Sequence, residues 1–420
     1  MRATKTFAAA GLCLAFAMPA SAQTPAEVVK TYADIAHAGY EDSLITAKTL
    51  DSAIDALIAS PSEETLAAAK AAWIAARVPY QQTEAFRFGN PIVDDWEGKV
   101  NAWPLDEGLI DYVDASYGSE SDENALYTVN VIANPKLKIN GKDVDASSIS
   151  PEFLSGTLHE AEEVEANVAT GYHAIEFLLW GQDLNGTDAG AGARPATDFD
   201  PANCTGGNCE RRAEYLKSAS TLLISDLEDM VGAWAEGGEA RKAVSEDPQV
   251  GLTAILTGMG SLSYGELAGE RMKLGLLLHD PEEEHDCFSD NTFNSHYYDA
   301  MGIRNVYTGR YERVDGSVVE GPSISQLVAK ADKGIDEELT AKLDATMDAM
   351  AAMKKRGESV EAYDQMIGEG NAEGNAVVQA AIDGLVAQTK PIERAVAALG
   401  LGDISVEGSD SLDNPNSVFQ

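Results

Sequence analysis

The sequence predicts an all-α fold, built as two helical-bundle-like domains with short β-hairpin excursions. Long stretches rich in Ala, Leu and Ile carry their apolar residues at helical spacing, which favours amphipathic helices. Strand is expected at two places, because Asn140-Gly141 and Asp315-Gly316 lie between alternating residues, as in tight hairpins. The order of helix pair, irregular loop, hairpin and helix occurs in both halves, which indicates an ancient duplication.

The N-terminal domain is expected to span residues 23–190. A first helix is predicted over 26–58, and a second opens at Pro61, has acidic residues in its first turn and is kinked at Pro79. After an irregular stretch and the first hairpin, a long helix is predicted over 151–180.

The C-terminal domain is expected to span residues 209–402, after a linker loop (191–208) rich in Gly, Asp and Pro. An irregular stretch is predicted over 280–305, and the acidic, polar tail, 403–420, is expected to be loose. Helices are predicted in this half over four stretches: 209–236, 249–279, 323–356 and 373–398.

The N-terminal segment, residues 1–22, has the pattern of a secretory signal peptide. Arg2 and Lys5 precede an apolar stretch, and Ala20-Ser21-Ala22 offers a small-residue cleavage site, with cleavage expected after Ala22. No later apolar run reaches the ~18–20 residues that a membrane span needs. The sequence therefore predicts an exported protein without a membrane span, periplasmic if the source is a Gram-negative bacterium.

The chain is strongly acidic, with 69 Asp and Glu residues against 30 Lys and Arg and a net charge of −39. Such a surface repels nucleic acid and anionic lipid, so nucleic-acid binding is excluded. The charge suits cations as partners, although solubility or a saline habitat also explains most of it.

Three of the four cysteines lie outside the signal segment. Cys204 and Cys209, in Cys-Thr-Gly-Gly-Asn-Cys, are expected to form a small loop disulfide in an oxidising compartment. A zinc site there would need two more ligands close by, and the sequence shows none. Cys287 is left either as a buried free thiol or as an alternative partner in the pairing.

The segment 171–180 is the most informative part of the sequence. His173 and Glu176 are three residues apart and therefore neighbours on one helix face, and the apolar residues around them indicate a buried helix. A buried carboxylate needs a cation, a donor or a proton. Gly171 is expected inside this helix, where a close backbone approach would explain it. A metal site and a structural His–Glu hydrogen bond are both consistent with these residues.

The pattern Gly-x-His-x-x-Glu, filled here by Gly171, His173 and Glu176, resembles the signature of the imelysin family. This resemblance implies an all-helical fold of two bundle-like domains and a periplasmic or surface role in iron acquisition. The implied partners are a metal ion and an outer-membrane or periplasmic component of iron uptake. Three stretches are similar to the family's iron-regulated protein A branch: 173–183, 260–272 and 285–292.

The imelysin family was named for a peptidase, and the residues of the helix that carries His173 and Glu176 can be compared with the motifs of zinc peptidases. Zinc peptidase helices usually carry a second His ligand, as His-Glu-x-x-His or His-x-x-Glu-His. Here Phe177 follows Glu176, and no other His lies on that face. The sequence therefore favours a metal-binding protein, with a metallopeptidase and a haem- or siderophore-binding module as alternatives.

Further metal ligands are expected on facing helices, because helix bundles build iron sites from inward Glu and His residues. Oxygen and imidazole ligands suit iron (Fe2+ or Fe3+) and also zinc or manganese. The candidates are His173 and Glu176, helped by Glu84, Glu270 and His285. For Glu84, a salt bridge to Arg87 or Arg77 is an equal alternative.

Three further histidines and one nearby acid are expected to have no part in the site. Helical spacing places Glu270 beside an apolar stripe and turns Glu266 further towards solvent. His37, His279 and His296 have no supporting context.

Overall fold

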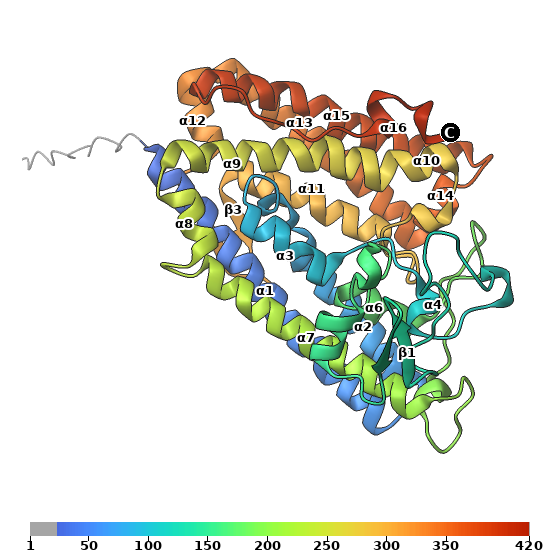
Figure 1. Ribbon diagram of the computed structural model, residues 1–420. Helices are drawn as coiled ribbons and strands as arrows, with labels where there is room; N and C mark the ends of the chain where they lie inside the picture. The colour runs from blue at the N-terminus through green and yellow to red at the C-terminus, as the bar shows by residue number, and fades with distance from the viewer. Residues whose placement is uncertain (1–22, 420) are drawn as a thin grey trace, which may run out of the picture.

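The computed structural model describes residues 23–419, which are mainly helical (Figure 1), so the expected signal segment lies outside the described residues. The all-α prediction is confirmed, because strands occur in the described chain only as two antiparallel hairpins. Both hairpins turn where Asn-Gly and Asp-Gly predicted them. Their strands are β1 (Lys136–Ile139), β2 (Lys142–Asp145), β3 (Arg310–Glu312) and β4 (Val318–Glu320).

One group of helices surrounds α1 (Pro25–Ala59), the blue helix of Figure 1. Two long helices, α2 (Glu63–Gln81) and α7 (Cys209–Trp234), pack along it. Because α7 lies with α1, the loop 191–208 does not separate the two groups of helices, and the division into two domains stays a prediction. The shorter helices of this group are α3 (Pro91–Asn101), α4 (Glu107–Ile110), α5 (Pro151–Phe153), α6 (Gly171–Trp180) and α8 (Glu239–Ser245).

The second group forms the upper layer of Figure 1. Here α9 (Pro248–Ser261) continues through a π-helix, Leu262–Lys273, into α10 (Leu274–Leu278). α15 packs on this π-helix and on α13, while α11 contacts both α13 and α2 and so joins the two groups. The bounds of the other helices are α11 (Thr292–Thr308), α12 (Ile324–Ala331), α13 (Lys333–Ser359), α14 (Tyr363–Ile367), α15 (Ala372–Leu399) and α16 (Asp410–Asp413).

The first two helices begin where their capping residues place them. Thr24 and Glu27 form a capping box before α1, because each side chain binds the backbone N–H of the other residue. Ser62 and Thr65 do the same at the start of α2. These reciprocal hydrogen bonds satisfy donors that the first helical turn leaves unpaired.

The prediction of one long helix over 151–180 is wrong. After α5 and a π-helical turn, Leu154–Leu158, the chain is irregular until α6 begins. Three glutamates in this part have positive φ angles, which no helix allows. Asn167 holds the irregular path, because its side chain donates to the carbonyl oxygen of Ala161 at 2.7 Å.

The stretch predicted as irregular, 280–305, contains most of α11. The buried side chains of this helix include Asn294, Ser295, His296 and Asp299. A helix whose buried face is polar has no apolar stripe, which is the signal that sequence periodicity detects.

The tail after residue 402 is also more ordered than predicted. Its short helix α16 packs against the π-helix. The buried Ser411 donates to the carbonyl oxygen of Gly269 at 2.9 Å, and the hydroxyl of Tyr264 donates to Asp413 Oδ1 at 2.7 Å.

Cys204 and Cys209 form a disulfide that links the preceding loop to the first residue of α7, as the spacing predicts. Cys287 is a partly buried free thiol. Across the described chain, every helix is too short or too polar to cross a membrane.

Candidate metal centre

The helix that carries His173 and Glu176 begins at Gly171, so this glycine is the first residue of α6 and does not lie in the helix interior as expected. Gly171 has φ +78°, and a Cβ atom there would lie 2.3 Å from the carbonyl oxygen of Val100 at the end of α3. The next turn is fixed by Trp73, whose Nε1 donates to the carbonyl oxygen of Tyr172 at 2.9 Å. The close backbone approach expected at Gly171 is therefore present, and it positions the first turn of α6.

We expect Gly171→Ala to destabilise the protein by roughly 2–5 kcal/mol. About 1–2 kcal/mol comes from the left-handed backbone, and about 1–3 kcal/mol comes from crowding against Val100. Gly118→Ala is the matched control, because Gly118 has φ +93° and no atom within 4 Å of the added Cβ. Urea denaturation of both variants measures the difference. An equal loss in the two proteins would contradict the role given to the α3 contact.

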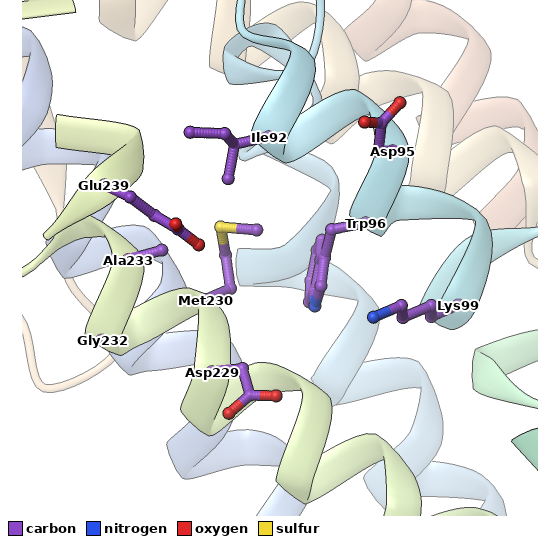
Figure 2. A pocket seen from close by; sticks show the side chains of 9 residues that line it. All are labelled: Ile92, Asp95, Trp96, Lys99, Asp229, Met230, Gly232, Ala233 and Glu239. Carbon is purple, nitrogen blue, oxygen red and sulfur yellow. The ribbon is translucent and has the colours of Figure 1, made fainter. Parts of the chain in front are cut away.

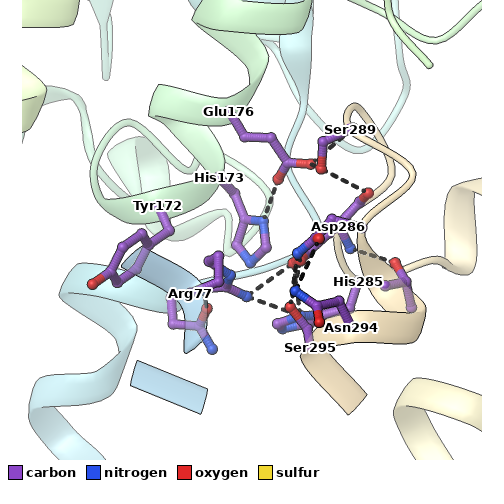
Figure 3. Close-up of polar contacts among 12 residues, drawn as sticks. Arg77, Tyr172, His173, Glu176, His285, Asp286, Ser289, Asn294 and Ser295 are labelled. Atoms are coloured by element: carbon purple, nitrogen blue, oxygen red, sulfur yellow. Dashed lines mark hydrogen bonds and ion pairs between the residues drawn. The ribbon is translucent and has the colours of Figure 1, made fainter. Parts of the chain in front are cut away.

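His173 and His285 meet in the interior between the two groups of helices. Their rings lie 4.7 Å apart, centroid to centroid, and nearly perpendicular. One ligand atom each from His173, His285 and Asp286 lies within 4.8 Å of the others, and all three residues are buried (Figure 3). The sequence predicted both histidines as ligands, but it did not single out Asp286.

The ring of His173 has one nitrogen bound and one nitrogen open. Nδ1 lies 3.1 Å from Glu176 Oε2, whereas the buried Nε2 has no hydrogen-bond partner among the described residues. Burial, with help from the positive charge of Arg77, lowers the pKa of His173 to about 3. The imidazole is therefore neutral near pH 7, and Nε2 offers a lone pair of the kind that metals bind.

Glu176 contacts the Nδ1 side of the His173 ring, opposite the open Nε2. Its Oε1 accepts hydrogen bonds from the backbone N–H of Ser289 at 3.0 Å and from the Ser289 hydroxyl at 2.6 Å. Burial, together with the nearby Asp286, raises the pKa of Glu176 well above its usual value. A carboxylate on the far nitrogen of a ligating imidazole is a common way of orienting it towards a metal. The geometry thus places Glu176 behind the ring, although the sequence indicated a direct ligand.

Asp286 lies on the segment before α11, and both of its carboxylate oxygens accept hydrogen bonds. Its Oδ1 accepts from Arg77 Nη2 at 2.9 Å, and its Oδ2 accepts from Asn291 at 2.9 Å and from Ser295 at 2.5 Å. Burial would raise the pKa of Asp286, but the Arg77 guanidinium and the neighbouring His285 outweigh it and hold that pKa well below its usual value. Asp286 is therefore an ionised carboxylate in the interior.

Arg77 is the buried cation that balances Asp286. It also lies 3.2 Å from His285 Nδ1 and donates to Asn101 Oδ1 at 2.6 Å. The aromatic faces of Trp73, Tyr80 and Tyr172 lie 5.0–5.7 Å from the guanidinium carbon and help to stabilise its charge without water.

His296 was expected to be ordinary, but α11 buries it beside this centre. Its ring lies 6.4 Å from that of His285, and its Nδ1 lies 3.7 Å from Asp299 Oδ2. Burial lowers the pKa of His296 to about 3. The i, i+3 spacing of His296 and Asp299 repeats that of His173 and Glu176, and this was the one sequence signal that could have identified the residue.

Glu84 is buried, but it pairs with an arginine that the sequence did not suggest. Its Oε2 accepts from Arg271 Nη2 at 2.7 Å, and Arg271 also pairs with Glu266 at 2.7 Å and with Asp299 at 3.4 Å. Glu84 therefore belongs to a charged cluster next to the histidines and lies outside the group of three possible ligands. Glu270 is exposed.

The expected orientations of Glu266 and Glu270 are reversed in the structure. Glu266 points inward, with an 18% exposed side chain that pairs with Arg271 and Arg87, and Glu270 faces solvent. The physical reason is the π-helix Leu262–Lys273, whose i→i+5 hydrogen bonds widen each turn. Positions assigned by the α-helical period of 3.6 are therefore wrong in this segment.

An acidic cavity of about 590 Å³ leads from the surface to this centre, and His285 is part of its wall. Arg87, Arg271 and Trp103 also line it. Most of the charged groups around it are carboxylates, contributed by Asp94, Asp95, Glu97, Glu160, Glu165, Glu266 and Glu270. Such a lining attracts cations from solution.

A second cavity, of about 640 Å³, lies between α3, α7 and α8 (Figure 2). It is lined by Trp96 and Met230 together with a few charged side chains, and none of the three clustered ligand residues reaches it. Its chemistry gives no reason to place the function there.

The comparisons with known proteins agree with the fold and with the family resemblance. The sequence model of the family described as Imelysin (peptidase M75) matches residues 36–392. The structure is similar to the crystal structure of a candidate iron-regulated protein A precursor from Parabacteroides distasonis, with a TM-score of 0.62 and 19% identity. The similarity covers 91% of this chain and 97% of that one. No functionally curated protein matches the sequence. Because the family match spans most of its length, the chain belongs to the imelysin family.

Proposed function

We propose that the protein binds a transition metal, with iron as the preferred ion, as a periplasmic component of an iron-acquisition system. The ligands would be His173, His285 and Asp286, and Glu176 would orient His173. Export and the periplasmic location rest on the sequence pattern of residues 1–22. A partner in iron uptake, at the outer membrane or in the periplasm, belongs to the same proposal.

The observation that carries the proposal is the unpartnered Nε2 of His173. A buried polar atom without a partner costs free energy, and native proteins rarely keep one without a reason. Here the open nitrogen lies in a group with a second neutral imidazole and an ionised carboxylate. Two histidines and one carboxylate are a common donor set for Fe2+, and the same set also binds zinc or manganese. The acidic cavity at His285 would supply the cation.

The peptidase alternative receives less support from the geometry. A metal-bound water needs a nearby base and access for a peptide. Glu176 is already engaged by His173 and Ser289, and all of these side chains are buried. The polar lining of the cavity at His285 likewise favours a small cation over a haem.

Metal binding by the mature, chelator-treated protein tests the proposal. We expect about one Fe2+ per chain under anaerobic conditions, with weaker binding of Mn2+ and comparable or tighter binding of Zn2+. Calorimetric titration followed by elemental analysis after gel filtration measures the stoichiometry. A fluorescent peptide library incubated with the loaded protein should remain uncleaved. Protein that retains no iron, manganese or zinc under any redox condition would refute the proposal, and metal-dependent cleavage would restore the peptidase.

A further inference from the structure

A second group of acidic side chains lies on the other side of the segment that carries His285 and Asp286. Ligand oxygens of Glu284, Asp290 and Asp364 lie within 4.8 Å of one another. Glu284 and Asp364 are each 1% exposed. The first two residues flank the turn before α11, and Asp364 comes from α14, so two distant parts of the chain meet here.

Four carboxylate oxygens of this group are buried without a partner. They are Oε2 of Glu284, Oδ1 of Asp290 and both oxygens of Asp364, none of which accepts a hydrogen bond from the described residues. Leaving even one buried carboxylate oxygen unpaired is expensive. Four in one place point to a missing partner that carries positive charge.

The electrostatics of the group agree with that reading. Burial, with repulsion from neighbouring carboxylates, raises the pKa values of Asp290 and Asp364 to about 7. Asp183 adds to the repulsion on Asp290 and Asp364. In contrast to Asp286, which has Arg77, no basic side chain is among the main influences on these three groups.

We propose that Glu284, Asp290 and Asp364 form a binding site for a hard divalent cation, Ca2+, which is separate from the histidine site. An all-oxygen, all-carboxylate set suits Ca2+ and lacks the imidazole or thiolate ligands that Fe2+ and Zn2+ usually have. Ca2+ keeps its oxygens about 2.3–2.6 Å away, so ligands across the ion are up to about 5 Å apart, whereas Mg2+ needs a tighter cage. The observed span fits the larger ion, and water would fill the remaining positions.

Such an ion would fasten both ends of the segment 284–290 to α14. That segment carries His285 and Asp286, and it also carries Ser289, which holds Glu176. Bound Ca2+ would therefore order the residues of the histidine site before a transition metal arrives. This coupling, unlike the Ca2+ site itself, rests on the proposed function.

The test uses the mature full-length protein in chelator-treated buffer. Wild-type protein should show a Ca2+-dependent rise in melting temperature and one Ca2+ by calorimetry, with a much weaker response to Mg2+. Tb3+, a luminescent substitute for Ca2+, should be sensitised by the adjacent Tyr363 and displaced by Ca2+. Asp364→Asn should weaken Ca2+ binding by roughly tenfold or more, because it removes a charged ligand. Glu284→Gln is a second variant with the same expectation, should the first not fold.

Two controls separate the possible outcomes. Glu369→Gln changes the charge equally at an exposed position five residues away and should leave the Ca2+ response intact. His173→Ala should also leave it intact, so failure of the histidine site does not affect this test. A wild-type protein that does not respond to Ca2+, or a response lost equally in Glu369→Gln, would overturn the proposal. If Asp364→Asn raised the melting temperature by the same amount with and without Ca2+, the proposal would also fail. That result would show that these carboxyl groups are protonated in the folded protein and need no cation.

Discussion

Replacing His173 with Ala should weaken iron binding by about 100-fold or more. The variant loses the open Nε2, and the nearby histidines cannot replace it, because His285 is already one of the proposed ligands and the His296 ring is 6.4 Å away from that of His285. Removing groups that only orient a ligand already costs about 10–100-fold in affinity. We expect that smaller loss for Glu176→Gln, which keeps the side-chain shape but weakens the hydrogen bond to Nδ1.

The same variants distinguish a metal site from a purely structural pair. Burial keeps His173 neutral, so in the metal-free protein the pair is a hydrogen bond between a neutral imidazole and the Glu176 carboxyl group. Its loss should cost about 1–3 kcal/mol, less than the roughly 3–5 kcal/mol of a broken buried ion pair. Fe2+ titration, circular dichroism and thermal melting of each variant measure both effects. His37→Ala, at a partly exposed position, is the control. Unchanged iron affinity in His173→Ala would remove this residue from the site.

Replacing Arg271 with Met should destabilise the protein by about 3–5 kcal/mol, because it leaves buried carboxylates without their cation. Arg271 is 2% exposed and pairs with Glu84, Glu266 and Asp299, two of which are almost completely buried. Methionine fills a similar volume, so the loss reports charge more than packing. Chemical denaturation in urea gives the change in the free energy of unfolding.

Arg394→Met is the matched control for this substitution. Arg394 is half exposed and pairs with Glu338 at the surface, where ion pairs contribute little. We therefore expect only a small change. If the two variants lost similar stability, the carboxylates near the histidines would have to be protonated in the folded protein, and Arg271 would not be their counterion.

Sequence periodicity predicted the parts of the fold that are built on apolar contacts. The helices α1, α7 and α15 lie within a few residues of their expected bounds, because Ala, Leu and Ile repeat there at helical spacing. The hairpins follow from Asn140-Gly141 and Asp315-Gly316, since those pairs supply the backbone angles of a tight turn.

Two of the larger errors fall where polar groups are buried. The path between α5 and α6 depends on hydrogen bonds such as that of Asn167, which have no periodic pattern. α11 was missed because its buried face carries His296 and Asp299, which lie beside the candidate metal centre. His173 and His285 were recognised from a motif and a resemblance, but the role of Asp286 appears only when Arg77 and Ser295 are seen around it.

The π-helix Leu262–Lys273 makes the register of this chain sensitive to deletion as well as to substitution. Each residue added to or removed from a helix rotates everything beyond it by roughly a quarter of a turn. Loss of one residue before Arg271 would therefore turn its guanidinium away from Glu84 and Asp299, even though every side chain was retained. A related protein would therefore keep this arrangement only if the helix had the same number of residues as well as the same side chains. A sequence alignment with a gap in this segment would pair residues whose side chains point in different directions.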